Sequence, residues 1–121
     1  MTPTLETKAR ARVAAAVGAI LLDRHQPGWA SRITRPITVN DLLDCPVAQV
    51  YGSWSYGIAR LTEAAGDPSL RYDTDRYGFT VGSGDPDALN AAWETEVALR
   101  RRRPLGRLRG YWRNLTARVA A

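Results

Sequence analysis

Apolar residues recur at spacings of three and four along most of the chain, and this period is typical of amphipathic helices. The pattern predicts four helices, over about residues 4–24, 45–65, 85–103 and 105–120. A connector over residues 25–44 and an irregular segment over residues 67–84 separate the first three. We therefore predict an all-α fold, a single small domain of about four helices with one long irregular loop.

The first predicted helix carries one apolar stripe, which we expect to face the core. Its members are Leu5, Ala9, Val13, Ala16, Val17, Ile20 and Leu21. Thr2 and Pro3 predict the start of this helix as N-cap and first-turn residue, and Pro27-Gly28 predicts its stop. In the connector that follows, Trp29 and Ile33 are the expected anchors on the core.

The second predicted helix contains a weak point at Gly52, where we expect a break or kink. Asp44 is its predicted N-cap and Gly66 its predicted C-terminal stop. Gln49 lies in its middle and must hydrogen-bond if it faces inward, for which the backbone of residues 67–84 is the candidate partner. The apolar residues at helical spacing are Val47, Val50, Tyr51, Trp54, Ile58 and Leu61.

The irregular segment contains three aromatic residues, Tyr72, Tyr77 and Phe79, which we expect to anchor it on the core. A short strand over residues 78–81 is an alternative, although no second strand is evident to pair with it. Asp85 and Pro86 then predict a clean start for the third helix. The inner residues of that helix are expected to be Leu89, Ala92, Trp93, Val97 and Arg100.

The last predicted helix has a narrow apolar seam that suits one partner helix. The seam residues are Leu105, Leu108, Trp112, Leu115 and Val119. We therefore divide the chain into a helical body over residues 1–103 and a basic amphipathic C-terminal helix over residues 104–121. This helix packs on the body or on a partner, and the seam would also serve for pairing two copies of the chain.

Composition supports a globular chain, because 45% of its 121 residues are hydrophobic and 24% are charged. The net charge of +5 is unevenly distributed. Residues 1–98 hold nine basic and all twelve acidic side chains, a net of −3, whereas residues 99–121 hold eight arginines and no acid, a net of +8. A mildly acidic body thus precedes a strongly basic tail.

The arginine cluster has four readings: a solvated basic face, a docking site for an acidic protein surface, a nucleic-acid contact, or a peripheral membrane contact. Tyr111 would add stacking to a nucleic-acid contact. The candidate partner-binding residues are Arg100, Arg101, Arg102, Arg103, Arg107, Arg109, Tyr111 and Arg113. The residues expected to be structural are Trp29, Gln49, Trp54, Phe79, Trp93 and Trp112.

The sequence contains no complete catalytic or metal-binding motif. The run from Asp73 to Gly78 begins like a calcium loop but lacks the glutamate required at position 12, where Gly84 stands. His25 and Cys45 are the only histidine and cysteine, too few for a disulfide framework or a nucleophile with an orienting group. We therefore predict no catalytic residue, metal or cofactor, and retain a small enzyme that uses Asp73, Asp75 or Asp85 only as a distant third class.

Three short blocks resemble a family of small uncharacterised proteins of actinobacteria and their phages. The blocks are Leu21-Leu22-Asp23 with Pro27-Gly28-Trp29, Cys45 to Gly52, and Tyr77-Gly78-Phe79 with Leu89 and Ala92-Trp93. They cover about residues 20–100, and the chain departs from the pattern at Pro46 and Ala48. The resemblance carries over no activity and implies a phage or prophage gene product.

The sequence therefore predicts a non-enzymatic phage or prophage accessory protein that binds a host or phage protein. The alternative is a DNA- or RNA-binding regulator that uses the C-terminal arginine cluster. With one cysteine, no recognisable signal peptide and no apolar run long enough to span a bilayer, we expect a cytoplasmic location in a bacterial host.

Overall fold

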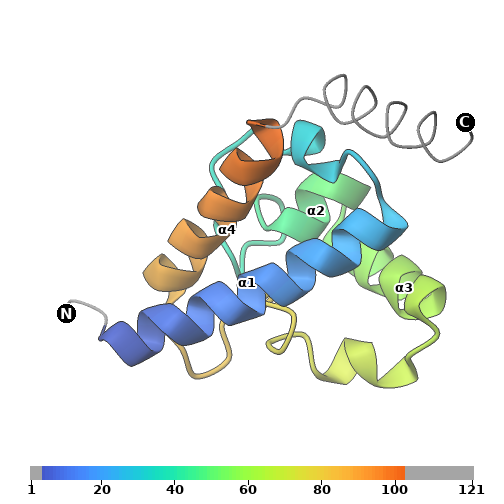
Figure 1. Cartoon of the computed structure of the whole chain (residues 1–121). Helices are drawn as coiled ribbons and strands as arrows, with labels where there is room; N and C mark the ends of the chain where they lie inside the picture. The colour runs from blue at the N-terminus through green and yellow to red at the C-terminus, as the bar shows by residue number, and fades with distance from the viewer. Residues whose placement is uncertain (1–3, 103–121) are drawn as a thin grey trace, which may run out of the picture.

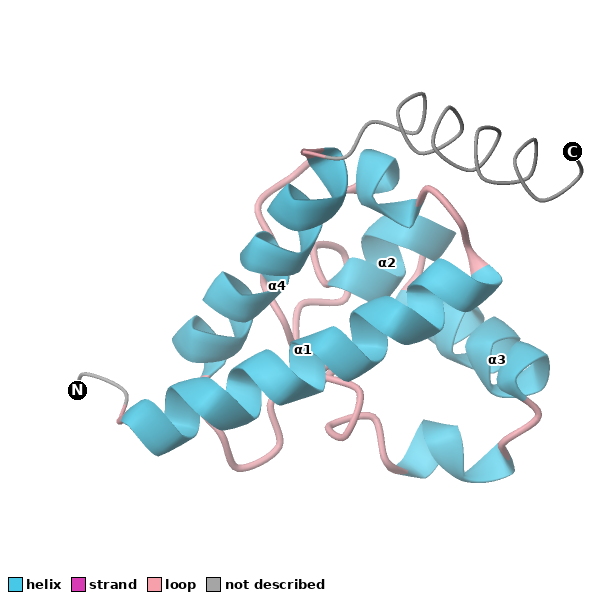
Figure 2. Cartoon of the chain, in the orientation of Figure 1, coloured by secondary structure: helices cyan, strands magenta, loops and turns pink. Residues whose placement is uncertain are grey.

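Four α-helices make up most of residues 4–102, the part of the chain that the computed structural model describes (Figure 1). They are α1 (Leu5–His25), α2 (Pro46–Tyr51), α3 (Trp54–Ala65) and α4 (Pro86–Arg101). Two 3-10 helices, η1 (Trp29–Arg32) and η2 (Pro68–Tyr72), lie in the connecting segments. Figure 2 shows no strand in this part of the chain, which confirms the all-α class and excludes the short strand over 78–81. The predicted helix over 105–120 lies outside the described residues.

Side-chain caps set the starts of the helices. The Thr4 hydroxyl accepts a hydrogen bond from the backbone N–H of Thr7 at 3.1 Å, so Thr4, and not Thr2, caps α1. The predicted cap of the second helix is also wrong by one residue, because Cys45 and not Asp44 is the N-cap of α2. The predicted start of α4 is confirmed, since the Asp85 carboxylate accepts from the N–H of Ala88 at 3.0 Å.

The second predicted helix is divided in two at Gly52, as its glycine indicated. Gly52 ends α2 with a φ of 95°, a backbone conformation that costs other residues strain. Ser53 then caps α3 by accepting from the N–H of Tyr56. Gly66 ends α3 with a φ of 65°, in agreement with the predicted stop.

The longest helices, α1 and α4, pack against each other and run in the same direction. Leu5 and Asp87 line one groove at their N-terminal ends, and Asp23 binds Arg100 at their C-terminal ends. In Figure 1, α1 lies in front, with α2 and α3 behind it. The segment over residues 73–85 returns beneath α1 to begin α4.

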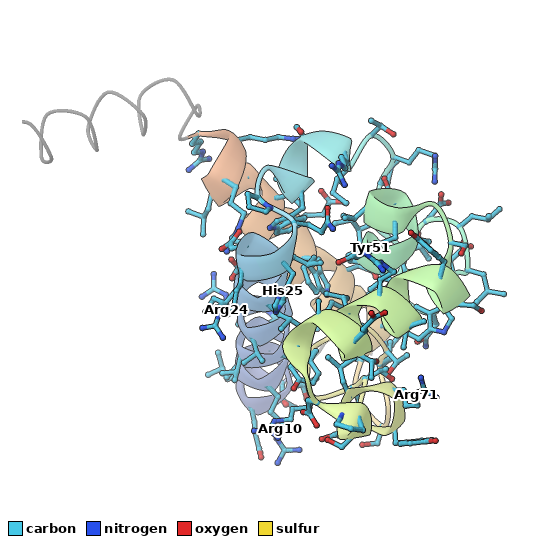
Figure 3. The ribbon with its side chains drawn as sticks, turned by 90° about the vertical axis from the view of Figure 1, so that its right-hand side faces the viewer. Arg10, Arg24, His25, Tyr51 and Arg71 are labelled. Atoms are coloured by element: carbon cyan, nitrogen blue, oxygen red, sulfur yellow. The ribbon has the colours of Figure 1, made fainter. Side chains whose placement is uncertain are left out.

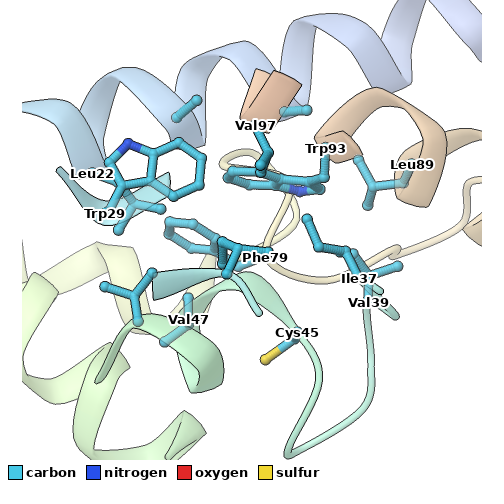
Figure 4. Close-up of a cluster of buried hydrophobic side chains, with 14 of the residues drawn as sticks. Leu22, Trp29, Ile37, Val39, Cys45, Val47, Phe79, Leu89, Trp93 and Val97 are labelled. Atoms are coloured by element: carbon cyan, nitrogen blue, oxygen red, sulfur yellow. The ribbon is translucent and has the colours of Figure 1, made fainter. Parts of the chain in front are cut away.

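The rings of Trp29, Phe79 and Trp93 lie at the centre of the core (Figure 4). The edge of Trp29 meets Trp93 at 5.8 Å between ring centroids, and Phe79 stacks on Trp93 at 5.9 Å. The partly buried Tyr77 ring stacks on Phe79, and the Trp93 indole N–H donates to the carbonyl of Gly78 at 2.6 Å. The structural roles predicted for Trp29, Phe79 and Trp93 agree with this burial.

Tyr72 is not the core anchor that the sequence predicted, because it is 83% exposed. It ends η2, whose buried residue is Leu70. A 3-10 helix turns about 120° per residue, so side chains two positions apart cannot both face the core. Trp54 fits its predicted role better, since it is half-buried and packs against the core.

The inner face of α1 lies largely opposite the predicted one, although Leu21 of the predicted stripe is partly buried and packs against the core. Its buried residues are Ala11, Ala15, Gly18, Ala19 and Leu22. A Cβ at Gly18 would lie 2.0 Å from the carbonyl oxygen of Tyr77 and 2.8 Å from the Trp93 ring. The small residues therefore face the core because the loop backbone and a large indole already occupy the space beside the helix.

Side chains of the helices hold the connector by its backbone. Gln49 is partly buried and forms hydrogen bonds, as the sequence predicted for an inward-facing amide. Its amide oxygen accepts from the N–H groups of Thr34 and Arg35, each at 3.0 Å. Its amide nitrogen donates to the carbonyls of Arg35 and Asp44, so the predicted partner in residues 67–84 is wrong. These four bonds satisfy backbone N–H and C=O groups of the connector that no helix or sheet pairs.

A second set of side chains holds the connector against α4. Glu94 accepts from the N–H of Ile37 and Asn90 from the N–H of Val39, both at 2.8 Å. Glu94 and Asn90 lie one turn apart on α4, and Ile37 and Val39 lie two apart in the extended chain, so the spacings match. This arrangement places both apolar side chains in the core.

Candidate docking surface

Arg100, a predicted contact residue for a partner, is instead bound within the fold. Its guanidinium donates two hydrogen bonds to the carboxylate of Asp23, at 2.8 and 2.7 Å, and pairs with Glu96 at 2.7 Å. It also lies 5.3 Å from the centre of the Trp29 ring. The Trp29 indole N–H donates to the same Asp23 at 2.8 Å. This cluster ties the C-terminal ends of α1 and α4 together.

The electrostatics of the cluster support this structural role. Burial acts to raise the pKa of Asp23, but hydrogen bonds from Arg100 and Trp29, with the charge of Arg100, outweigh it and hold the pKa below its ordinary value. The hydrogen bonds to Asp23 in turn raise the pKa of Arg100. Both groups therefore stay charged and paired, and Arg100 joins the two helices, in agreement with its predicted place among the inner residues of this helix.

Arg101 is also turned toward its own fold, because its guanidinium donates to the carbonyls of Ile33 and Ala30 in the connector. Arg102 is exposed. The other predicted contact residues and Trp112 lie outside the described residues: Arg103, Arg107, Arg109, Tyr111 and Arg113. Among the arginines of the cluster that the structure describes, Arg102 alone makes no side-chain hydrogen bond or ion pair to another described residue.

The residues examined for chemistry have local structural roles. The thiol of Cys45 is buried and accepts from the N–H of Ala48, and burial raises its pKa above the ordinary value. Asp85 caps α4, and His25 ends α1 in its last turn. Among residues 4–102, no three metal-ligating side chains come together.

Three large apolar residues of α1 lie on its solvent side. Leu5 is 86% exposed, Val13 is 63% exposed and Ile20 is 57% exposed. With the alanines between them they form one row along the helix, which we name the outer stripe and define as Leu5, Ala9, Val13, Ala16 and Ile20. At 1.5 Å per residue the outer stripe is about 22 Å long. Single exposed apolar residues are ordinary, whereas three aligned on one helix make this face a candidate contact surface.

Cations border the outer stripe on both sides. At 100° per residue, Lys8 and Arg12 lie on the side of α4, and Arg10 and Arg24 lie on the opposite side. Figure 3 shows Arg10 and Arg24 projecting away from α3, into solvent. The acidic residues of α1 are Glu6, which pairs with Arg10 at 2.5 Å, and Asp23, which Arg100 holds. The exposed face of α1 is therefore apolar along its middle and basic along its borders.

An open groove of about 510 Å³ adjoins the stripe at its N-terminal end. On the side of α1 it is lined by Leu5, Lys8, Ala9 and Arg12. On the side of α4 it is lined by Asp87, Ala88, Ala91, Ala92 and Thr95. Its floor is made largely of alanines, so a side chain of a partner could enter between the two helices.

Sequence reasoning found every residue of the outer stripe but assigned the stripe to the core. The overlooked signal was the set Ala11, Ala15, Gly18, Ala19 and Leu22, which also recurs at spacings of three and four. Two competing stripes on one helix indicate that one face packs closely and that the other is free for a second contact.

The structure thus defines a small all-α protein with an exposed apolar helix face between basic borders. No protein-family model, curated protein or solved structure matches the chain. The resemblance to small actinobacterial and phage proteins therefore stays a prediction. Within residues 4–102, none of the helices has the length and apolar character needed to cross a bilayer.

Proposed function

We propose that this chain is a non-enzymatic accessory protein of a phage or prophage that acts by binding a host or phage protein. The observation that carries the proposal is the outer stripe of α1, whose Leu5, Val13 and Ile20 are all more than half exposed. Covering these side chains removes apolar area from water, which is the main favourable term in protein association. Because α1 already packs along its opposite face, its backbone does not have to become ordered when a partner binds, and this lowers the entropic cost of association.

Other exposed apolar residues are weaker candidates for the contact. Leu42 and Leu43 lie in a turn, and Tyr72 lies at the end of η2. Each site presents one or two side chains, whereas the outer stripe aligns three on a single element. The alternative function, nucleic-acid binding through the arginine cluster, loses Arg100 and Arg101 to contacts within the fold.

Affinity purification with two matched variants tests the proposal. The full chain is tagged and used on an actinobacterial lysate treated with nuclease, beside the double variant Val13→Asp/Ile20→Asp. A second variant, Ser55→Asp/Ala59→Asp, adds the same charge to exposed positions of α3. We expect wild type and the α3 variant to recover the same protein, and the α1 variant to lose it while unfolding at the same temperature.

Two results would contradict the proposal. Recovery of the same protein by all three chains would show that the outer stripe is not the contact. A bound fraction that disappears on nuclease treatment, and that falls steeply with salt, would favour the nucleic-acid alternative.

A further inference from the structure

We infer that the segment docking on the outer stripe is an acidic amphipathic helix of a partner protein, an inference that rests on the proposed function. A helix is the occupant that matches the shape of the site, because the stripe is straight, narrow and about 22 Å long. A partner segment of about 15 residues would cover it.

The sizes of the stripe residues specify how such a helix packs. Large and small side chains alternate along the stripe, with Ala9 between Leu5 and Val13, and Ala16 between Val13 and Ile20. The two alanines leave hollows into which large side chains of a facing helix can insert. The groove beside Ala9 enlarges the first hollow and adds the alanines of α4 to its wall.

The charges of the borders specify the chemistry of the partner. Lys8, Arg10 and Arg12 are exposed along the two sides of the stripe, and Arg24 is exposed one turn beyond its end. Two carboxylates lie beside these four cations, Glu6 in its pair with Arg10 and Asp87 on the α4 side of the groove, so positive charge is in excess. Carboxylates on both borders of a partner helix would meet these cations around an apolar centre. Such complementarity guides encounter and selects the partner, while the apolar contact supplies most of the affinity.

The same charges argue against a second copy of this chain as the occupant. The midpoint of the stripe is Val13, next to Arg12. Antiparallel pairing about this midpoint would bring Arg12 of one copy beside Arg12 of the other. Parallel pairing would bring Arg12 of one copy near Arg10 of the other, although Glu6 on that border would meet Lys8. The antiparallel arrangement is therefore the more strongly disfavoured of the two.

Two model peptides test the inference on the full chain. One is an 18-residue amphipathic helix with a leucine face bordered by glutamates, and the other carries lysine at every glutamate position. We expect the acidic peptide to bind, with at least a tenfold preference over the basic one, when fluorescence anisotropy of labelled peptide is measured at low salt. Val13→Asp/Ile20→Asp should weaken that binding at least tenfold although it leaves the arginine tail intact.

Charge reversal makes the test specific to the borders. Lys8→Glu/Arg12→Glu should reduce binding of the acidic peptide and increase binding of the basic peptide, because the attractive pairs change sign. Light scattering should give the mass of one chain under the same conditions, and vesicles of phosphatidylglycerol and phosphatidylcholine should not compete for the site.

Five results would overturn the inference. The peptides could bind equally, or the acidic peptide could bind the Val13→Asp/Ile20→Asp variant unchanged, which would place it on the tail. The chain could dimerise through the stripe, or the vesicles could displace the peptide. If neither peptide binds while the stripe variant still loses its partner from lysate, the acidic-helix inference fails and the proposed function stands.

Discussion

α1 and α4 pack against each other, but they bury side chains of opposite size. α4 buries large side chains, among them Leu89, Trp93 and Val97. α1 buries three alanines, one glycine and one leucine. Three large residues of α1, Leu5, Val13 and Ile20, are more than half exposed. The difference follows from volume, because the space that Trp93 fills is unavailable to the helix facing it. Bulk alone therefore does not identify the inner face of a helix, and large residues excluded from the core remain available for another contact.

The strongest test of this comparison enlarges the close contact at Gly18. Gly18→Val should destabilise the fold by about 3 kcal/mol or more, because its side chain meets the backbone of Tyr77 and the ring of Trp93. Chemical denaturation, followed by the fluorescence of the buried tryptophans, measures the loss.

Ala9→Val on the outer stripe is the matched control for that substitution. It places the same β-branched residue on the exposed side of the same helix and should cost about 0.5 kcal/mol through helix propensity. Equal losses at the two positions would show that α1 moves away from the loop at little cost, and the comparison would fail.

What the sequence could predict in these two helices was local. The Asp85-Pro86 start of α4 and the glycine breaks at Gly52 and Gly66 follow from neighbouring residues, and the structure agrees with each. The inner face of α1 depends on Trp93 and Tyr77, which are more than fifty residues away in the chain. No local pattern reports that contact, so the rule that large apolar residues face inward gave the wrong side.

Contacts between residues far apart in the chain also explain why the candidate site was predicted only in part. Helical spacing placed Arg100 among the inner residues of its helix, but its charge also grouped it with the arginine cluster. Nothing near it in the sequence indicates its partner Asp23, which lies 77 positions away. Gln49 was recognised as a residue that needs partners, but its partners in the connector depend on the tertiary fold. Spacing identified the residues of the outer stripe, and only the packing of α1 shows that they are exposed.

A smaller effect is expected where the ends of the two helices are joined. Asp23→Asn keeps an oxygen for the Trp29 indole but removes the charge that binds Arg100. We expect a loss of about 1 kcal/mol at pH 7, reduced by solvent screening because the Asp23 side chain is 47% exposed. The free energy of unfolding in urea, measured at several pH values, gives this difference.

The destabilisation caused by Asp23→Asn should become smaller as the pH falls. Since folding lowers the pKa of Asp23, its contribution is complete above the ordinary carboxyl pKa of about 4 and is lost as the pH falls through the folded value. Wild type and Asp23→Asn should therefore converge in acid. Glu6→Gln, at the exposed pair with Arg10, should show almost no difference at any pH. A gap for Asp23→Asn that does not change with pH would mean that the charge is not what joins the helices.

The smallest effect is expected on the outer stripe itself. Val13→Ser should change the free energy of unfolding by less than about 0.5 kcal/mol, because Val13 is mostly in water in the folded chain and the two residues have similar helix propensities. Val97→Ser makes the same change on α4, where the side chain is 2% exposed. There the cavity and the buried hydroxyl should cost about 3 kcal/mol in the same urea titration. Similar losses at both positions would mean that α1 buries its large residues after all, and the outer stripe would then have no apolar surface to offer a partner.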